Sequence, residues 1–211
     1  MDAAAIDDTI AALRCNRFDV RFAENRDSAR EIFFGEIIPE VRPETVSWGD
    51  SMTMRACGIV DGLDRIPGVA VIRTFDPSYD ARQKLYWRRR AMLCDMFVTG
   101  SNAVTRRGQI VNLDMIGNRA GAIVFGPSFV TLFVGANKIV EDLDAAFRRV
   151  REVAAPLNAA RHAHLKTPCS KTGKCMDCSS PDRICNSWTV IEKCHPAGRI
   201  KVILIGEELG L

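Results

Sequence analysis

Residues 130–154 read V-T-L-F-V-G-A-N-K-I-V-E-D-L-D-A-A-F-R-R-V-R-E-V-A, and this stretch decides the fold. Its first five residues form a short continuous apolar run, which is typical of a fully buried strand. Residues 141–154 follow with apolar positions at helical spacing, an acidic start and an arginine-rich end that suits the helix dipole. A buried strand that leads into an amphipathic helix is the repeating unit of α/β proteins with a mostly parallel sheet.

The same alternation of strand and helix continues on both sides of this unit. We expect helices over 6–14, 27–38, 51–57, 81–92 and 118–123, and strands over 45–48, 69–72, 96–98, 109–112, 188–192 and 200–205. The sequence therefore predicts an α/β protein whose mostly parallel sheet has helices on both faces. We expect a single domain over 1–211, which includes a cysteine-rich loop at 161–187 and the final strands at 188–211.

Glycines and polar residues follow three of the predicted strands at their carboxyl ends. They are Gly49 and Ser51, Gly100 and Asn102, and Asn137 and Lys138. In parallel sheets ligands bind beyond the carboxyl ends of the strands, and glycine permits a close approach of the backbone. We therefore expect a pocket here, in which Lys138 supplies a cation for a small anionic substrate or ligand. Ordinary turn chemistry is the alternative, because the same residue types favour turns.

Four cysteines, Cys169, Cys175, Cys178 and Cys185, lie in one short basic loop with the spacing C-x5-C-x2-C-x6-C. Thiolates this dense in a reducing compartment usually hold a metal, and neighbouring basic residues offset their charge. One close pair with two outlying cysteines favours an iron–sulfur cluster, and we expect the 4Fe-4S type. A structural zinc, which commonly uses two close pairs, is the main alternative, and disulfides are a further one.

Composition excludes several classes of partner. The formal net charge of +3 over 211 residues is too small to argue for nucleic acid or an anionic membrane. No apolar run is long enough to span a bilayer, and the acidic N-terminal segment lacks the basic start of a secretory signal. We expect a cytoplasmic protein with no nucleic-acid and no membrane partner. Cys15, Cys57 and Cys94 stand singly among apolar neighbours and are expected to be core thiols.

Three blocks of the sequence resemble the LUD domain of lactate-utilization proteins. They are V-S-W-G-D-S-M-T at 46–53, G-S-N-A-V-T-R-R-G-Q-I-V-N at 100–112 with Asp114 and G-N-R at 117–119, and V-G-A-N-K-I-V at 134–140. A subset of that family is also similar through the cysteine loop and the closing residues 202–210. The resemblance covers nearly the whole chain. It implies the fold shared by ribose-5-phosphate isomerase, glucosamine-phosphate deaminase and CoA-transferases, the NagB/RpiA/CoA-transferase-like superfamily.

The block at 100–112 also looks like the loop of the sugar-phosphate isomerase branch of that superfamily. That loop typically has an aspartate where this chain has Asn102, and an asparagine cannot act as a general acid or base. The resemblance adds Asn112 and Asp114 to the expected substrate-binding residues. Asp114 is the candidate substitute carboxylate for a metal-free, isomerase-like reaction.

For function, the resemblance implies a lactate-utilization-type protein in redox or hydroxy- and oxo-acid metabolism, associated with an iron–sulfur oxidoreductase partner. With a cluster on its cysteines, the chain would be an oxidoreductase component. The alternative is a non-redox binding or assembly subunit for a carboxylate or sugar phosphate, stapled by zinc. A homodimer is also expected, because dimers are the commonest soluble oligomers.

Overall fold

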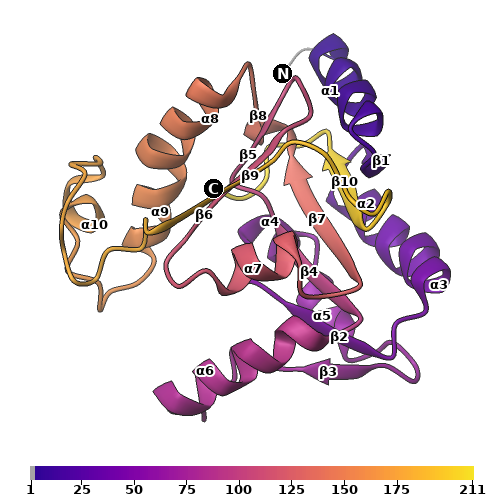
Figure 1. The fold of residues 1–211 in the computed structure, drawn as a ribbon, viewed down its shortest axis with the longest axis horizontal. Helices are drawn as coiled ribbons and strands as arrows, with labels where there is room; N and C mark the ends of the chain where they lie inside the picture. The colour runs from indigo at the N-terminus through magenta and orange to yellow at the C-terminus, as the bar shows by residue number, and fades with distance from the viewer. Residues whose placement is uncertain (1–2) are drawn as a thin grey trace.

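The computed structural model describes residues 3–211. Within these residues the main sheet has six strands, and every neighbouring pair is parallel (Figure 1). In spatial order they are β1 (Asp19–Ala23), β10 (Ile200–Ile205), β7 (Phe129–Gly135), β4 (Met96–Gly100), β2 (Thr45–Trp48) and β3 (Ala70–Ile72). The predicted parallel sheet is confirmed, with the residues of 130–134 at its centre.

Alternate residues of the central strands face opposite sides of this sheet, as the period of a strand requires. Val202 and Leu204 of β10 belong to one hydrophobic core, whereas Ile203 and Ile205 belong to another. The first core is closed by α1 (Ala3–Cys15) and α7 (Asn118–Val124), and the second by α2 (Arg26–Ile32), α4 (Met52–Ala56) and α5 (Ile59–Leu63). Helices therefore cover both faces of the sheet, as predicted.

A second, mixed sheet carries the strands that the main sheet leaves out. In the described part of the chain it has four strands, in the order β8 (Ile139–Val140), β5 (Ala103–Thr105), β6 (Ile110–Asp114) and β9 (Ser187–Ile191). The β5–β8 pair is parallel, whereas β5–β6 and β6–β9 are antiparallel. Helix α8 (Leu143–Arg149) packs on it through Ala146, in a third hydrophobic core. The predicted strands at 109–112 and 188–192 thus pair with each other in this sheet.

Two predicted helices run on further than expected. The helix from α2 continues through a π-helical turn at Phe33–Ile37 into α3 (Ile38–Val41), and α8 continues through a π-helical turn at Val150–Ala154 into α9 (Ala155–Ala160). Short helix α10 (Pro168–Thr172) lies in the cysteine loop. None of the helices within residues 3–211 is long and apolar enough to cross a membrane.

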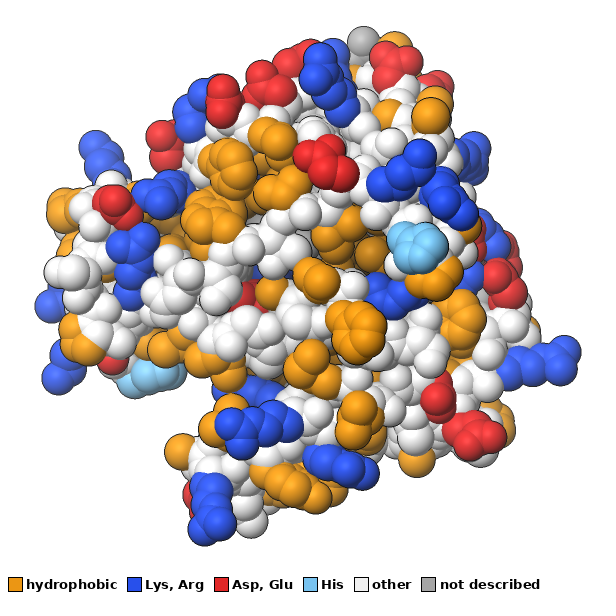
Figure 2. Space-filling model, viewed as in Figure 1, with side chains coloured by type: hydrophobic (Ala, Val, Ile, Leu, Met, Phe, Trp, Pro, Cys, Tyr) orange, Lys and Arg blue, Asp and Glu red, His pale blue; other side chains and the backbone are white. Residues whose placement is uncertain are grey.

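The basic run at 87–90 lies on α6 (Ala81–Arg90), which projects from the body of the molecule. None of the residues of this helix is buried, and basic side chains lie among hydrophobic ones on it in the space-filling view (Figure 2). A capping box between Asp80 and Gln83 begins the helix, and a 3-10 turn at Ala91–Leu93 ends it.

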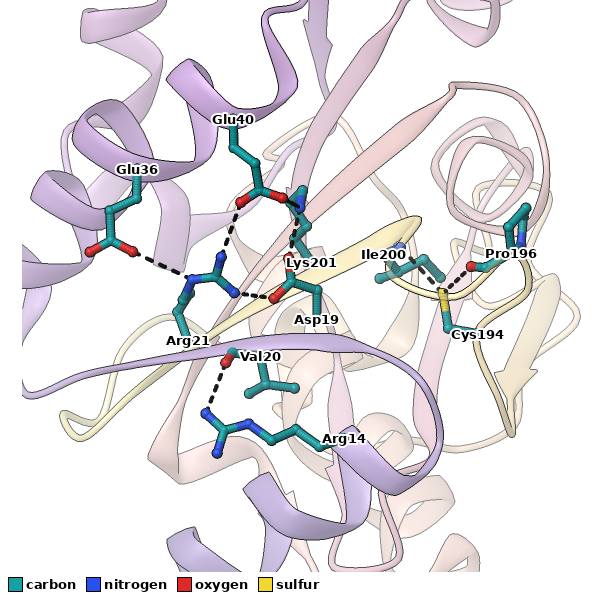
Figure 3. A network of polar contacts seen from close by, with 10 residues as sticks. All are labelled: Arg14, Asp19, Val20, Arg21, Glu36, Glu40, Cys194, Pro196, Ile200 and Lys201. Atoms are coloured by element: carbon teal, nitrogen blue, oxygen red, sulfur yellow. Dashed lines mark hydrogen bonds and ion pairs between the residues drawn. The ribbon is translucent and has the colours of Figure 1, made fainter.

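Strand β1 was not predicted, because its sequence, D-V-R-F-A, has two charged residues among five. Those charges belong to an ionic network with Lys201 of β10 (Figure 3). The Lys201 side chain is only 3% exposed, and its Nζ lies 2.7 Å from Asp19 Oδ2 and 2.6 Å from Glu40 Oε1. Arg21 pairs with Asp19, Glu36 and Glu40. Burial of a charge is tolerated when it is paired, so this network joins α3 to the edge of the sheet.

The expected core thiols divide into two kinds. Cys57 and Cys94 are buried, and burial raises the pKa of Cys57 to about 11 and that of Cys94 to about 12. Cys15 is exposed, so the expectation of a core thiol was wrong there. It is the last residue of α1, where the apolar face of the helix has already ended.

Candidate functional site

A cavity of about 330 Å³ opens where the carboxyl ends of β2, β4 and β7 meet. Five of the eight predicted substrate-binding residues line it: Ser51, Gly100, Asn102, Asp114 and Lys138. They come from three separate strand ends and from the end of β6, so the two sheets together form the pocket. The structure places the predicted residues around one cavity; the ligand that they hold stays a prediction.

Gly49, Asn112 and Asn137 do not line the cavity but support residues that do. A Cβ atom on Gly49 would lie 2.8 Å from Oγ1 of Thr99, so only glycine fits at the end of β2 without a shift. The buried Asn112 accepts a hydrogen bond on Oδ1 from the backbone N–H of Asn102 at 3.3 Å. These contacts fix the positions of the strand ends around the cavity.

Arg119 of α7 holds this wall of the pocket together, although it was not among the predicted site residues. Its Nε donates to Asp114 Oδ1 at 2.9 Å, and its terminal nitrogen donates to Asn102 Oδ1 at 2.7 Å. It also donates to Asn112 Oδ1 and to the carbonyls of Gly100 and Leu113. The side chain is only 12% exposed, and Asp114 balances its charge. Arg119 is thus a positioning residue whose donors already have partners.

Lys138 is a buried amine on the short helical turn at Ala136–Lys138 that follows β7. Its Nζ donates to Thr53 Oγ1 at 2.7 Å, and no carboxylate pairs with it among residues 3–211. Burial lowers the pKa of Lys138 to about 7, and the nearby charges of Arg149 and Arg119 act in the same direction. The amine therefore changes its charge near neutral pH.

The closing residues of the chain pack over this lysine. Thr53 Oγ1 donates to the Leu209 carbonyl at 3.0 Å, and the Leu209 N–H donates to Asn137 Oδ1 at 3.2 Å. A Cβ atom on Gly210 would collide with Thr53 and would lie 3.2 Å from the Lys138 amine. Glycine at position 210 therefore lets the tail approach the lysine closely.

Arg149 of α8 binds the backbone that follows two of the strands, at Asn102 after β4 and at Asn137 after β7. Its Nε donates to the carbonyl of Asn137 at 3.0 Å, and its NH1 donates to the carbonyl of Asn102 at 2.7 Å. Burial lowers the pKa of Arg149 from its ordinary value. Its charge adds to the positive field at the Lys138 amine.

The side chains that line the cavity carry more positive than negative charge. It includes the four cations Arg88, Arg119, Lys138 and Arg161 and the two carboxylates Asp50 and Asp114. Arg161 pairs with Asp50 at 3.1 Å, and Arg119 pairs with Asp114. Lys138 and Arg88 have no carboxylate partner within the described ranges. Two cations are therefore left to face an anionic ligand.

Asp50 is one of the two acidic side chains that line the cavity. Burial alone would raise the pKa of Asp50, but the neighbouring Arg161 and Arg55 outweigh burial and hold it below its usual value. The carboxyl group of Asp50 is thus ionised near neutral pH and paired with arginine, as Asp114 is paired with Arg119.

The first part of the cysteine loop forms a wall of the same cavity. His162, His164 and Leu165 line it, and so does Ile184, which immediately precedes Cys185. Burial lowers the pKa of His162, and the charge of Arg161 acts in the same direction. The loop and the pocket are therefore adjacent parts of one structure.

The four cysteines share one neighbourhood without forming a ligand cage. Burial raises the pKa of Cys185 to about 11, and the charges of Cys175, Cys169 and Cys178 add to this effect against that of Arg183. In the chain from Ala3 onward, however, no three histidine, cysteine or acidic side chains are placed to hold a metal ion. The structure thus brings the four predicted ligands into one loop, and their metal stays a prediction.

Arginines fasten this loop to the body of the protein. Arg183 donates to the carbonyls of Cys178 and Cys185 and pairs with Asp177 at 2.9 Å. Asp177 also pairs with Arg151, which follows α8, at 3.0 Å. Arg183 and Arg151 therefore both hold the cysteine loop near Cys178.

Sequence comparison decides the family of this chain. The model of the LUD domain matches residues 6–205. The chain belongs to the LUD domain family. Membership confirms the resemblance and implies a function related to lactate utilization. A comparison with curated proteins gave no match.

Two solved structures are similar to this LUD domain. A DUF162 family protein from Deinococcus radiodurans superposes with a TM-score of 0.55 at 13% identity, over 97% of this chain and 98% of that one. Ribose 5-phosphate isomerase from Plasmodium falciparum matches with a TM-score of 0.31 at 15% identity, over 55% and 54% of the two chains. At this identity the first likeness supports the fold alone.

Proposed function

We propose that this LUD domain binds a small organic anion of the hydroxy- or oxo-acid class in the cavity at the carboxyl ends of β2, β4 and β7. The observation that carries the proposal is the charge of the lining. Lys138 and Arg88 have no carboxylate partner in the described structure, whereas the other two lining cations are paired. An unpaired charge in a partly desolvated site is favourable only when an anion compensates it.

Ser51 provides a group that can orient such a ligand. Its Oγ accepts a hydrogen bond from the Met54 N–H at 3.3 Å as the N-cap of α4, so its own proton remains available to a ligand. Asn102 is held on both sides by Arg119 and by the Leu113 N–H. A carboxylate in the cavity would then have a cation and a hydroxyl donor to bind, while Asn102 and Arg119 keep the wall rigid.

Calorimetry with matched ligands tests the proposal. We expect lactate and pyruvate to bind and lactamide, which has a similar shape but no charge, to bind much more weakly. Lys138→Met should weaken lactate binding roughly tenfold or more, because a hydrogen bond to a charged group is lost. Lys193→Met, at an exposed position, is the control and should bind as the wild type does. Equal binding of lactate and lactamide would rule out an anion site.

The cysteine loop gives the second part of the proposal, in which Cys169, Cys175, Cys178 and Cys185 hold an iron–sulfur cluster. Support comes from the donor set, since three thiols of one basic loop, Cys169, Cys175 and Cys178, act on the pKa of the fourth, Cys185. Arg183 and its partner Asp177 would fix the backbone around them. A bound cluster would supply one-electron transfer. A zinc ion bound by the same cysteines would only stabilise the structure of the loop beside the pocket.

Metal analysis separates these two outcomes. Protein purified without oxygen should contain about four irons and four sulfides per chain and should absorb visible light. Cys175→Ser should lower the iron content, whereas Cys15→Ser, at an exposed thiol outside the loop, should leave it unchanged. A colourless protein with zinc would favour the non-redox alternative, and an unchanged iron content in Cys175→Ser would remove that cysteine from the site.

A further inference from the structure

Among residues 3–211 two lysines are buried, and their surroundings differ in a way that has a chemical consequence. Lys201 is 3% exposed and lies between the carboxylates of Asp19 and Glu40 (Figure 3). Lys138 is 4% exposed and has no carboxylate partner in the described part of the chain. Only Lys138 opens on the cavity. Lys201 has the partners that keep an amine protonated, whereas the surroundings of Lys138 favour the neutral form.

The hydrogen bonds of Thr53 leave the lone pair of that amine unused. The single hydroxyl proton of Thr53 is donated to the Leu209 carbonyl at 3.0 Å. Its oxygen can therefore only accept from Lys138, whose Nζ lies at 2.7 Å. A neutral amine that donates one N–H keeps its lone pair available to the cavity.

The charges around Lys138 also resemble those that activate a nucleophilic lysine. The charges of Arg149 on α8 and Arg119 on α7 lower its pKa from two elements, and Cys57, next to α4, acts in the opposite direction. Desolvation together with neighbouring cations is the combination that makes lysine a nucleophile towards carbonyl compounds. The Lys138 amine is thus in a position to act as a nucleophile, a role that anion binding does not require.

We propose that Lys138 captures the carbonyl carbon of a small oxo acid as an imine. The nitrogen lone pair adds to the carbonyl carbon, and the carbonyl electron pair moves to oxygen. Both hydrogens of the amine then leave with that oxygen as water, and a C=N bond remains, so no oxidant or reductant is needed. This step rests on the proposed function: while Lys138 is neutral, Arg88 is the lining cation without a carboxylate partner in the described structure, and it would hold the carboxylate of the acid.

Reductive trapping tests the proposal on the intact protein. Pyruvate is added with sodium cyanoborohydride, which delivers hydride to an imine carbon and makes the bond permanent, and the modified lysine is located by peptide mass spectrometry. We expect the adduct on Lys138 and none on Lys201, which serves as the internal control in the same sample. Excess lactate should suppress the adduct on Lys138 but not the slow background on exposed lysines such as Lys193.

Two variants and one binding measurement complete the test. Lys138→Met and Lys138→Arg should both lose the fast adduct, whereas Lys193→Met should keep it. Adducts spread evenly over exposed lysines, or an undiminished fast adduct in the Lys138 variants, would overturn the proposal. If a variant does not fold, the peptide map of the wild-type protein still shows which lysine carries the adduct.

Failure of this inference can be told apart from failure of the anion site. If calorimetry shows binding of pyruvate and lactate but no adduct forms on Lys138, the imine is refuted and the anion site stands. If the adduct forms on Lys138 without competition by lactate, the imine stands and the anion site is refuted. If neither binding nor adduct is found, both proposals fail.

Discussion

At the scale of single residues, the space that glycine leaves decides the shape of the pocket. A Cβ atom on Gly100 would collide with the Ser51 hydroxyl and would lie 3.1 Å from the Phe133 carbonyl. The absent methyl group is therefore what allows the ends of β2 and β4 to meet around Ser51. The position of the hydroxyl that we assign to ligand binding depends on a residue that has no side chain.

Gly100→Ala should weaken the binding of lactate roughly tenfold and destabilise the protein by about 1–3 kcal/mol, because an added methylene in a packed site forces its neighbours to move. Calorimetry and urea denaturation measure the two effects. Gly35→Ala is the matched control, since nothing lies within 4 Å of a Cβ atom at that helical position. It should leave binding unchanged and should not destabilise the protein. Equal effects of the two substitutions would contradict this account.

The depressed pKa of Lys138 gives the stability of the protein a specific dependence on pH. In the unfolded chain a lysine titrates near 10.4, whereas in the folded protein Lys138 has a pKa of about 7. The unfolded state therefore binds more protons between these values, and the free energy of unfolding rises with pH across that window. Below pH 7 the burial of a charged amine costs the folded state of the order of a few kcal/mol.

Lys138→Met should remove this dependence. We expect the variant to be more stable than the wild type below pH 7 and to lose that advantage as the pH approaches 10. Denaturation curves at a series of pH values measure the difference directly. Lys193→Met, whose amine is exposed, should follow the wild type at every pH. A constant difference between Lys138→Met and the wild type would show that Lys138 is charged throughout.

At the scale of elements, Arg119 links α7 to the loop between β4 and β5 and to β6. Arg119→Met should destabilise the protein by about 3–5 kcal/mol, because it leaves the Asp114 carboxylate, which is only 8% exposed, without its partner. Arg106→Met is the control: its pair with Glu141 is 46% and 71% exposed and should contribute less than about 1 kcal/mol. Thermal and urea unfolding compare the two, and similar losses would mean that Arg119 does not organise the site.

The elements also show which parts of this fold a sequence can predict. Strands β4, β7 and β10 are mainly apolar runs with both faces buried, so composition alone identified them. The short strands β5 and β8 were missed, because three and two residues carry no period and depend on partners that are distant in sequence. Strands β6 and β9 of the second sheet were predicted, but their pairing with each other and that of β5 with β8 join residues that are distant in sequence.

The residues of the candidate site also divide into those that a local sequence signal predicts and those that depend on tertiary packing. Glycines and polar residues at strand ends are a local signal, and five of the eight predicted residues line the cavity. Arg119 and Arg149 were missed because an arginine on a helix usually faces solvent, and only the packing of α7 and α8 turns these two inward. The G-N-R segment at 117–119 was part of the family resemblance, and it was the one available signal for Arg119.

At the scale of the whole molecule, the cysteine loop forms part of the wall of the cavity. His162, Leu165 and Ile184 belong to the loop and line the cavity. A metal held by the loop would therefore stabilise the wall, and by linkage an anion bound in the cavity would strengthen metal binding by the same factor. We expect removal of the metal by a chelator to weaken lactate binding about fivefold or more.

Titration of lactate into metal-loaded and metal-free protein measures this coupling, and titration of the metal with and without lactate measures its reciprocal. Cys15→Ser should retain the full coupling, whereas Cys175→Ser should already bind lactate as the metal-free protein does. The same lactate affinity in both metal states would show that the wall is rigid without the metal.

The path of the chain through Gly135–Val140 sets a strict limit on its length. Strand β7 is in register with β10 as far as Gly135, and β8 is in register with β5 from Ile139 onward. Only three residues separate these two fixed points, and Lys138 is the last of them. An inserted or deleted residue would break one of the two registers or turn the amine away from the cavity. Natural or engineered relatives that keep the amine in this cavity should therefore vary freely in the length of exposed loops but not by a single residue between these two sheets.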